Sequence, residues 1–434
     1  MQKLTVWLRY ITQPIFIICI IFPASKINAQ QARLTIDEAY KLAKQNYPLI
    51  KHRDLISKTK EYSVDNASKG YLPVFSVNGQ ATYQSAVTNL PFSIPLPGFN
   101  MPELSKDQYK IYAEVNQVIY DGGVIKNQKQ VAETNELVQQ QNLEVALYTL
   151  YDRVNQLFFG ALLINEQLKQ NELLNKNIQN GIDKATALLA NGTAYRSSVD
   201  ELSAQLLQTQ QARVELKAAK KAYLDMLSLF VNNQLDENTI LEKPATAILS
   251  DNINRPELLF YDYQKKTYDL QDELLKTQLR PKFNLFIQGG YGRPGLNMLS
   301  NDFALYSIGG LRLNWNLGSL YTLKNQKQLI DINRKTIDVQ KETFLFNTSI
   351  TQKQQNAELA KYLELLKKDE SIVALRESVK NAAAAQLENG VLSAHDYITQ
   401  VIAEDQARQN LILHNIQMLQ AQYNYQNTTG NIKK

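Results

Sequence analysis

The sequence has few residues with the chemistry of a catalytic or metal-binding site. Its three histidines are His52, His395 and His414, and none of them belongs to a helical zinc motif such as H-E-x-x-H. His395 directly precedes Asp396, so a proton could pass between an imidazole and a carboxylate at this point. The sequence contains no G-x-S-x-G motif, and its acidic residues are spread out as on solvated helix faces. We therefore predict no enzyme, no cofactor and no metal site.

One stretch matches a nucleotide-binding fingerprint. Gly290, Gly292 and Gly295 have the spacing G-x-G-x-x-G and follow a predicted strand. The fingerprint binds a pyrophosphate only where a helix starts at the third glycine, because the helix amides then point at the phosphates. Pro294 interrupts the stretch, and strand-like alternation resumes after it. We therefore expect a hairpin loop here.

The first 29 residues differ from the rest of the chain. Lys3 and Arg9 precede an apolar run at residues 11–22, and Ala29 provides a small residue for cleavage. This pattern is typical of a secretory signal peptide, with a short membrane anchor as the alternative. Cleavage would remove Cys19, the only cysteine, so the mature chain would form no disulfide and no thiolate metal site.

The composition of the 434 residues is globular but polar, with 44% apolar and 21% charged residues. There are 47 basic and 42 acidic residues, and three of the basic ones lie in the predicted signal peptide. The nearly neutral remainder gives no electrostatic reason to expect nucleic acid as a partner. Beyond the signal peptide no apolar run is long enough to cross a bilayer as a helix. A membrane-spanning part would therefore have to consist of strands.

Two short motifs recur at the same distance along the chain. NQKQ begins at Asn127 and again at Asn325, which is 198 residues later. The Asn-Gly pairs of ANGTAYRSSVDEL and ENGVLSAHDYITQ begin at Asn191 and Asn389, again 198 residues apart. Equal spacings of unrelated motifs indicate an internal duplication.

Proline-free stretches predict unusually long helices. We expect each half to have a leading helix, a long helix and a return helix, at residues 35–69, 124–191 and 197–232 and at residues 257–278, 320–389 and 393–427. A helix of about 70 residues would be roughly 105 Å long. Each long helix should end at its Asn-Gly pair, because both residues tolerate the left-handed conformation.

Between the leading and long helices the hydrophobic period changes to two. The segments VFSVNGQATYQ, YKIYAEVNQVIY, FNLFIQGGY and LRLNWNL place apolar or small residues at odd positions and mostly polar ones at even positions. They predict four strands in two hairpins. The predicted organisation is therefore a signal peptide (1–29), a first repeat (30–232), a linker or equatorial segment (233–256) and a second repeat (257–434).

This duplicated plan resembles the TolC family of outer membrane efflux proteins over nearly the whole mature chain. The resemblance rests on YDGG entering a long helix, on each N-G followed within eight residues by Asp, and on the ending YNYQNTTGN. It implies a membrane α/β-barrel fold, in which three protomers contribute four strands each to a 12-stranded outer-membrane β-barrel. That barrel would continue into a long periplasmic helical barrel.

The family resemblance also implies the function and the partners. The homotrimer would be a passive channel for substrates delivered by an inner-membrane pump and a periplasmic adaptor. The apolar odd strand positions would face outer-membrane lipid; they are Phe75, Val77, Tyr83, Ile111, Val115, Phe283, Leu285, Ile287, Leu311, Leu313 and Trp315. The adaptor would dock at the helical tips, which comprise Gly192, Thr193, Gly390, Val391 and Leu392.

The resemblance places the channel aperture beside these tips. Three copies of Asp396 would form a carboxylate ring, as in cation-selective constrictions. In the first half Ser198 stands at the matching position and the acid comes later, at Asp200. Thr399 occupies a site where some relatives have a second acid. Leu392 replaces a basic residue that latches the closed state in some relatives. Asp396 could instead be a helix N-terminal acid that is stabilised by the dipole.

Two alternatives stay open at this point. An exported coiled-coil scaffold without a channel would explain the long helices, but not the four alternating strands. A channel of this family could also export polypeptides rather than small molecules. The sequence does not specify the cargo or the pump.

Overall fold

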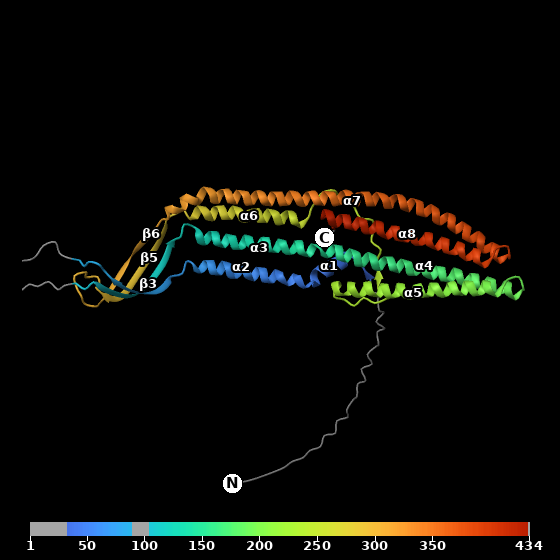
Figure 1. Ribbon diagram of the computed structural model, residues 1–434, viewed down its shortest axis with the longest axis horizontal. Helices are drawn as coiled ribbons and strands as arrows, with labels where there is room; N and C mark the ends of the chain where they lie inside the picture. The colour runs from blue at the N-terminus through green and yellow to red at the C-terminus, as the bar shows by residue number, and fades with distance from the viewer. Residues whose placement is uncertain (1–32, 89–103, 433–434) are drawn as a thin grey trace, which may run out of the picture.

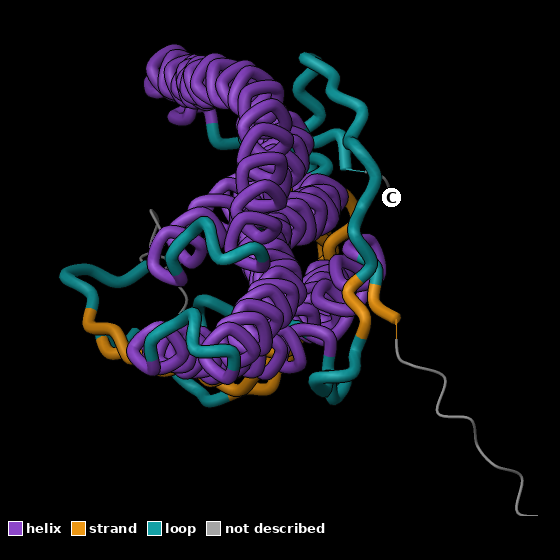
Figure 2. Tube along the Cα trace, turned by 90° about the vertical axis from the view of Figure 1, so that its right-hand side faces the viewer, coloured by secondary structure: helices purple, strands orange, loops and turns teal. Residues whose placement is uncertain are grey.

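The computed structural model describes residues 33–88 and 104–432. The predicted signal peptide and most of the loop in the first hairpin lie outside these residues. The molecule is elongated, with a small sheet at one end and long helices along the remainder (Figure 1). Seen along this axis, the helices follow a curved arc (Figure 2).

The sheet contains four antiparallel strands in the order β2-β3-β5-β6. Their bounds are Val74–Tyr83 (β2), Asp107–Tyr120 (β3), Lys282–Arg293 (β5) and Ala304–Asn314 (β6). The two predicted hairpins are confirmed, and they join through β3 and β5. Gly290 and Gly292 lie within β5 itself, so the glycine motif is part of the strand and of the loop that follows it.

The pairing register places the odd-numbered apolar residues on one face. Phe75 lies opposite Val115, Val115 lies opposite Ile287, and Leu285 lies opposite Leu311. A β-bulge between Val118 and Tyr120 shifts the register only at the end of β3. Side chains at every second position point to the same side of a sheet, so the predicted apolar face is continuous across four strands.

Four helices lie side by side next to the sheet. They are α2 (His52–Lys69), α3 (Val124–Tyr148), α6 (Pro256–Thr277) and the first part of α7 (Leu320–Glu388). In the far half, α4 (Leu150–Ala190) packs with α5 (Arg196–Val231), and α7 packs with α8 (Ala394–Thr429). Contacts between α4 and α8 join the two pairs. Within the described residues, no helix has the length and apolar character needed to cross a membrane.

Two predicted helices are interrupted. The first leading helix divides into α1 (Ile36–Asn46), a 3-10 turn (Pro48–Lys51) and α2, because Pro48 lacks an amide hydrogen and disfavours helical backbone at Tyr47. The first long helix is broken at Thr149, between α3 and α4. The Thr149 hydroxyl donates to the Ala146 carbonyl at 2.9 Å, and such back-bonding bends helices.

The largest hydrophobic core lies near the middle of the molecule. It joins α1, α4, α5 and α8 around fully buried side chains such as Phe158, Phe159 and Leu227. The short parallel pair of β1 (Arg33–Leu34) and β4 (Ile240–Leu241) closes this region. A second core at the helical tips contains Ile178, Leu202 and Val401. The two cores hold the long helices together at separate points along the rod.

Candidate functional site

The helical tips are formed by two matching turns. Gly192 and Gly390 have φ angles of +72° and +69°, and their amides donate to Leu189 and Leu387 at 3.0 Å. The next amide in each turn donates one residue further back, as in a Schellman cap. Glycine is required here because a side chain is strained at such φ angles. The sequence prediction that both long helices end at Asn-Gly is therefore confirmed.

The tip surface is open. No atom lies within 4 Å of the Cβ position of Gly192 or of Gly390, and Val391 is 76% exposed. Thr193 uses its hydroxyl to bind the Leu188 carbonyl at 3.0 Å. Leu392 packs on the edge of the tip core. The predicted docking residues therefore cluster at one end of the molecule, and most of them face solvent.

Asp396 takes part in the cap of α8. Its amide donates to the Ser393 hydroxyl oxygen at 3.1 Å, and the Ser393 hydroxyl donates to its carboxylate at 2.6 Å. The carboxylate is therefore fixed in the first turn, where the helix dipole also favours a negative charge. This geometry suits the capping role, and it also presents an acid at the tip.

The other two predicted aperture residues make local contacts. Thr399 donates to the His395 carbonyl at 2.9 Å within α8. Asp200 lies 3.9 Å from Nε of Arg196 within α5. In the described part of the chain, no hydrogen bond or ion pair joins Asp200, Thr399 and Asp396 to one another.

His395 links the two return helices. Its Nδ1 lies 2.7 Å from Oε1 of Glu201, so α8 and α5 are joined at the tip. The hydrogen bond with Glu201 raises the pKa of His395, and the charges of Glu201 and Asp396 add to the rise. The sequence analysis noted His395 only as a neighbour of Asp396 and did not identify Glu201.

Two further contacts hold α7 and α8 against α4. The Tyr397 ring packs on Gly181, and its hydroxyl donates to the Asn177 carbonyl at 3.0 Å. Lys184 binds Glu388 at 2.7 Å, and this hydrogen bond lowers the pKa of the Glu388 carboxyl. The sequence analysis missed both contacts, although a glycine inside a long helix was a signal of close packing.

At the other end of the molecule, the sheet has two chemically different faces. The odd-numbered face is strongly exposed, with Phe75 and Val77 both 76% exposed. On the even-numbered face, Arg312 donates to Glu114 at 3.1 Å, and Gln288 donates to the other oxygen of the same carboxylate. Just after β6, the Trp315 indole donates to the Leu279 carbonyl at 2.9 Å.

The described residues contain no group of three or more His, Asp or Glu side chains that could hold a metal ion. Arg312, Glu114 and Gln288 satisfy one another, and the tip residues bind the backbone or each other.

Residues 39–231 match the family model described as "Outer membrane efflux protein". Solved structures share the fold at low sequence identity. The outer-membrane channel OprN is 11% identical with a TM-score of 0.64, covering 92% of this chain and 90% of that chain. CusC is 12% identical with a TM-score of 0.64, covering 91% of each chain. The CmeC outer membrane channel of Campylobacter jejuni is 13% identical with a TM-score of 0.61, covering 91% and 85%. No curated protein sequence matches the chain.

Proposed function

We propose that the chain belongs to the outer membrane efflux protein family, whose model matches residues 39–231, and that three copies assemble into one continuous tunnel. Membership makes the chain an outer-membrane efflux channel rather than an enzyme. The proposal adds the homotrimer, the lipid-facing residues, the aperture and the docking tips. In it, the chain conducts substrates passively, and a separate inner-membrane pump and periplasmic adaptor deliver them.

The main support for a trimer is that the four-stranded sheet is open at both edges. β2 and β6 are the outer strands of the order β2-β3-β5-β6, so each has one edge without a partner among the residues that the structure describes. Such edges cannot stay unpaired in lipid, because no water satisfies their backbone groups. β2 and β6 run in opposite directions, so β6 of one copy can pair antiparallel with β2 of the next. Three copies would close a barrel of twelve strands.

The aromatic residues support the placement of this sheet in a membrane. Phe283 contacts Tyr120 near the helices, where Trp315 also lies, and Tyr291 stacks on Phe303 at 5.5 Å near the other end. Phe283 and Tyr291 are eight residues apart in β5. At about 3.3 Å per residue and a tilt of about 40°, they lie roughly 20 Å apart along the barrel axis. Aromatic girdles flank an apolar band of about 25 Å in such barrels.

In the closed barrel the apolar face would contact lipid and the polar face would line the tunnel. Glu114, Gln288 and Arg312 would then lie on the tunnel wall, where water and counter-charges are present. The opposite arrangement would place the Glu114 carboxylate against hydrocarbon, at a cost of several kcal/mol. The curved arc of the helices suits the wall of a tunnel that continues beyond the barrel (Figure 2).

We assign the aperture and the docking surface to the tips. Three copies of Asp396 around the axis would form a carboxylate ring, with Thr399 and Asp200 beside it. The adaptor would bind the exposed turns at Gly192, Thr193 and residues 390–392. The support for this assignment is that both turns and the capped Asp396 lie at the same end of the rod, opposite the sheet.

The test uses the full-length protein purified from outer membranes in detergent. The expected particle has about three times the mass of one chain, and it should insert into planar bilayers as a stable channel. A coiled-coil scaffold would yield well-folded, helical protein without conductance, and that result would overturn the proposal. Recovery from the membrane fraction only after detergent extraction provides an independent check.

A further inference from the structure

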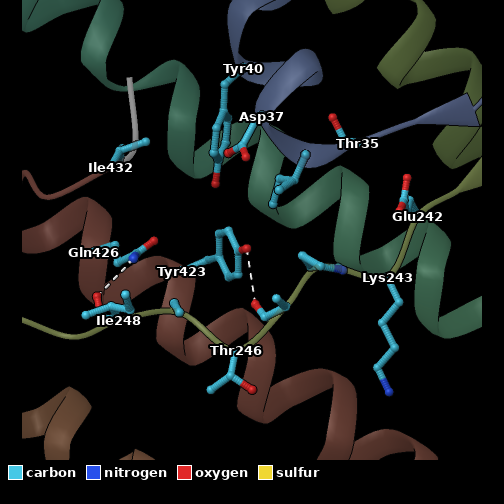
Figure 3. Close-up of a pocket in the computed structure, with 14 residues that line it drawn as sticks. Thr35, Asp37, Tyr40, Glu242, Lys243, Thr246, Ile248, Tyr423, Gln426 and Ile432 are labelled. Carbon is cyan, nitrogen blue, oxygen red and sulfur yellow. Dashed lines mark hydrogen bonds between the residues drawn. The ribbon is translucent and has the colours of Figure 1, made fainter.

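A pocket lies in the middle of the molecule, outside both the sheet and the tips. It is bounded by the start of α1, by residues 242–248 and by the C-terminal part of α8 (Figure 3). Its volume is about 230 Å³. At about 30 Å³ per water molecule, it could hold several waters or one small organic group.

Three oxygen-bearing side chains meet in this pocket. Asp37 and Tyr40 project side by side from α1, and Tyr423 faces them from α8 (Figure 3). The Tyr40 hydroxyl donates to Oδ1 of Asn155, and the Tyr423 hydroxyl donates to the Ala245 carbonyl at 3.3 Å. Both hydroxyl groups therefore donate their hydrogens to protein acceptors, and the lone pairs of both oxygens can accept hydrogen bonds from a ligand.

The Asp37 carboxylate has no hydrogen bond or ion pair among the described residues. Burial raises the pKa of both Tyr40 and Tyr423, and the negative charge of Asp37 adds to each rise. Two of the donors that line the pocket are used elsewhere: Thr35 donates to Glu38, and Gln426 donates to the Ile248 carbonyl at 3.0 Å. Lys243 extends away from the three oxygens (Figure 3).

We propose that this pocket binds a small organic cation through a guanidinium or primary ammonium group. Such a group supplies several N–H donors and a positive charge. These match the carboxylate of Asp37 and the hydroxyl oxygens of Tyr40 and Tyr423, which act as acceptors in the pocket. The tyrosine rings add a cation–π attraction. A metal ion fits less well, because Glu242, the other carboxylate that lines the pocket, lies apart from Asp37 (Figure 3) and the tyrosines are protonated.

The first turn of α1 offers a simpler explanation for Asp37, since acids stabilise helix N-termini. That role does not depend on the pocket. Asp54 is likewise an acid in the first turn of its helix, α2, and it does not line the pocket. Asp54→Asn is therefore a matched control for Asp37→Asn.

The experiment titrates the full-length protein with Nα-acetyl-L-arginine amide and with Nα-acetyl-L-citrulline amide, in which a neutral urea group replaces the guanidinium and no ammonium group is present. Calorimetry should show saturable binding of the arginine compound only. Asp37→Asn should weaken this binding at least tenfold, whereas Asp54→Asn should leave it unchanged. Equal binding of both compounds, or unchanged binding by a normally helical Asp37→Asn variant, would overturn the proposal. The comparison of the two compounds on the unmodified protein does not depend on any variant folding.

Discussion

The ring of Tyr397 lies so close to Gly181 that a Cβ added to this glycine would come within 2.5 Å of the ring. The two residues belong to different halves of the chain, and their contact brings α8 against α4. Gly160 has the same relationship to Tyr223, at 2.6 Å. Both glycines lie inside α4, and each lets the ring of a tyrosine on a return helix pack directly against the α4 backbone.

Replacing Gly181 by alanine should destabilise the tip. The added methyl would force the buried Tyr397 ring away from α4, and such overpacking costs about 1–3 kcal/mol. This loss should exceed the gain in helix propensity from alanine, which is up to about 1 kcal/mol. Thermal unfolding followed by circular dichroism would measure the change.

Gly79→Ala is the control for that measurement, since no atom lies within 4 Å of the Cβ position of Gly79. Its midpoint should stay close to that of the unmodified protein. The double variant Gly181→Ala/Tyr397→Leu should recover part of the lost stability, because the smaller side chain leaves room for the methyl. A single Gly181→Ala variant as stable as the unmodified protein would show that the ring moves freely.

Two substitutions in the middle of the proposed apolar band test which face of the sheet contacts lipid. Ile287 lies midway between Phe283 and Tyr291 in β5, so Ile287→Lys places a charge near the membrane midplane and should cost about 2–4 kcal/mol. Ser76→Lys places the same charge on the polar face at nearly the same level, because Ser76 pairs with Glu114 and Glu114 pairs with Gln288, and it should have little effect. Urea unfolding from lipid vesicles would compare the two variants. A larger loss for Ser76→Lys than for Ile287→Lys would reverse the assignment.

Much of the fold could be predicted from local patterns in the sequence. Alternation with a period of two identified the strands, because one face is apolar across all four of them. The Asn-Gly pairs identified the tips, because Gly192 and Gly390 need positive φ. The break at Pro48 could also have been predicted, since proline disfavours helical backbone at the preceding residue. The break at Thr149 has no comparable signal in the sequence.

The contacts at the tip could not be predicted in this way. His395 and Glu201 are 194 residues apart, and they meet only because α5 and α8 end side by side. The same is true of Tyr397 and Asn177, which are 220 residues apart. The pocket around Asp37 combines three separate segments, so neither spacing nor composition indicates it.

Asp396 has two candidate roles, and two substitutions can separate them. Asp396→Asn removes the charge of the proposed ring, so cation selectivity in planar bilayers should fall. Ser393→Ala removes the capping hydroxyl and should cost about 1 kcal/mol of stability, but it should leave selectivity unchanged. The reversal potential in a salt gradient and the thermal midpoint measure the two effects separately.

If Asp396 served only as a capping residue, both variants would lose stability and both would keep the selectivity of the unmodified channel. Asp200→Asn is a useful comparison, because among the described residues this acid pairs only with Arg196, on its own helix. A smaller loss of selectivity for Asp200→Asn than for Asp396→Asn would identify Asp396 as the dominant charge.

The His395–Glu201 contact should make the tip sensitive to pH. The pKa of His395 is raised in the folded protein, because Glu201 stabilises the imidazolium. The stabilising effect of the pair is therefore complete below the ordinary histidine pKa of about 6.5 and is lost as the pH rises through the higher native value. Weakening the link between α5 and α8 at higher pH should increase the fraction of time that the channel is open.

Single-channel recordings at a series of pH values would check this expectation. Glu201→Gln should abolish the pH dependence, because a neutral amide does not stabilise the imidazolium. Arg196→Gln is the matched control, since it disrupts an exposed ion pair within α5 and leaves the contact between α5 and α8 intact. A Glu201→Gln channel with the same pH dependence as the unmodified protein would show that the His395–Glu201 pair is not responsible.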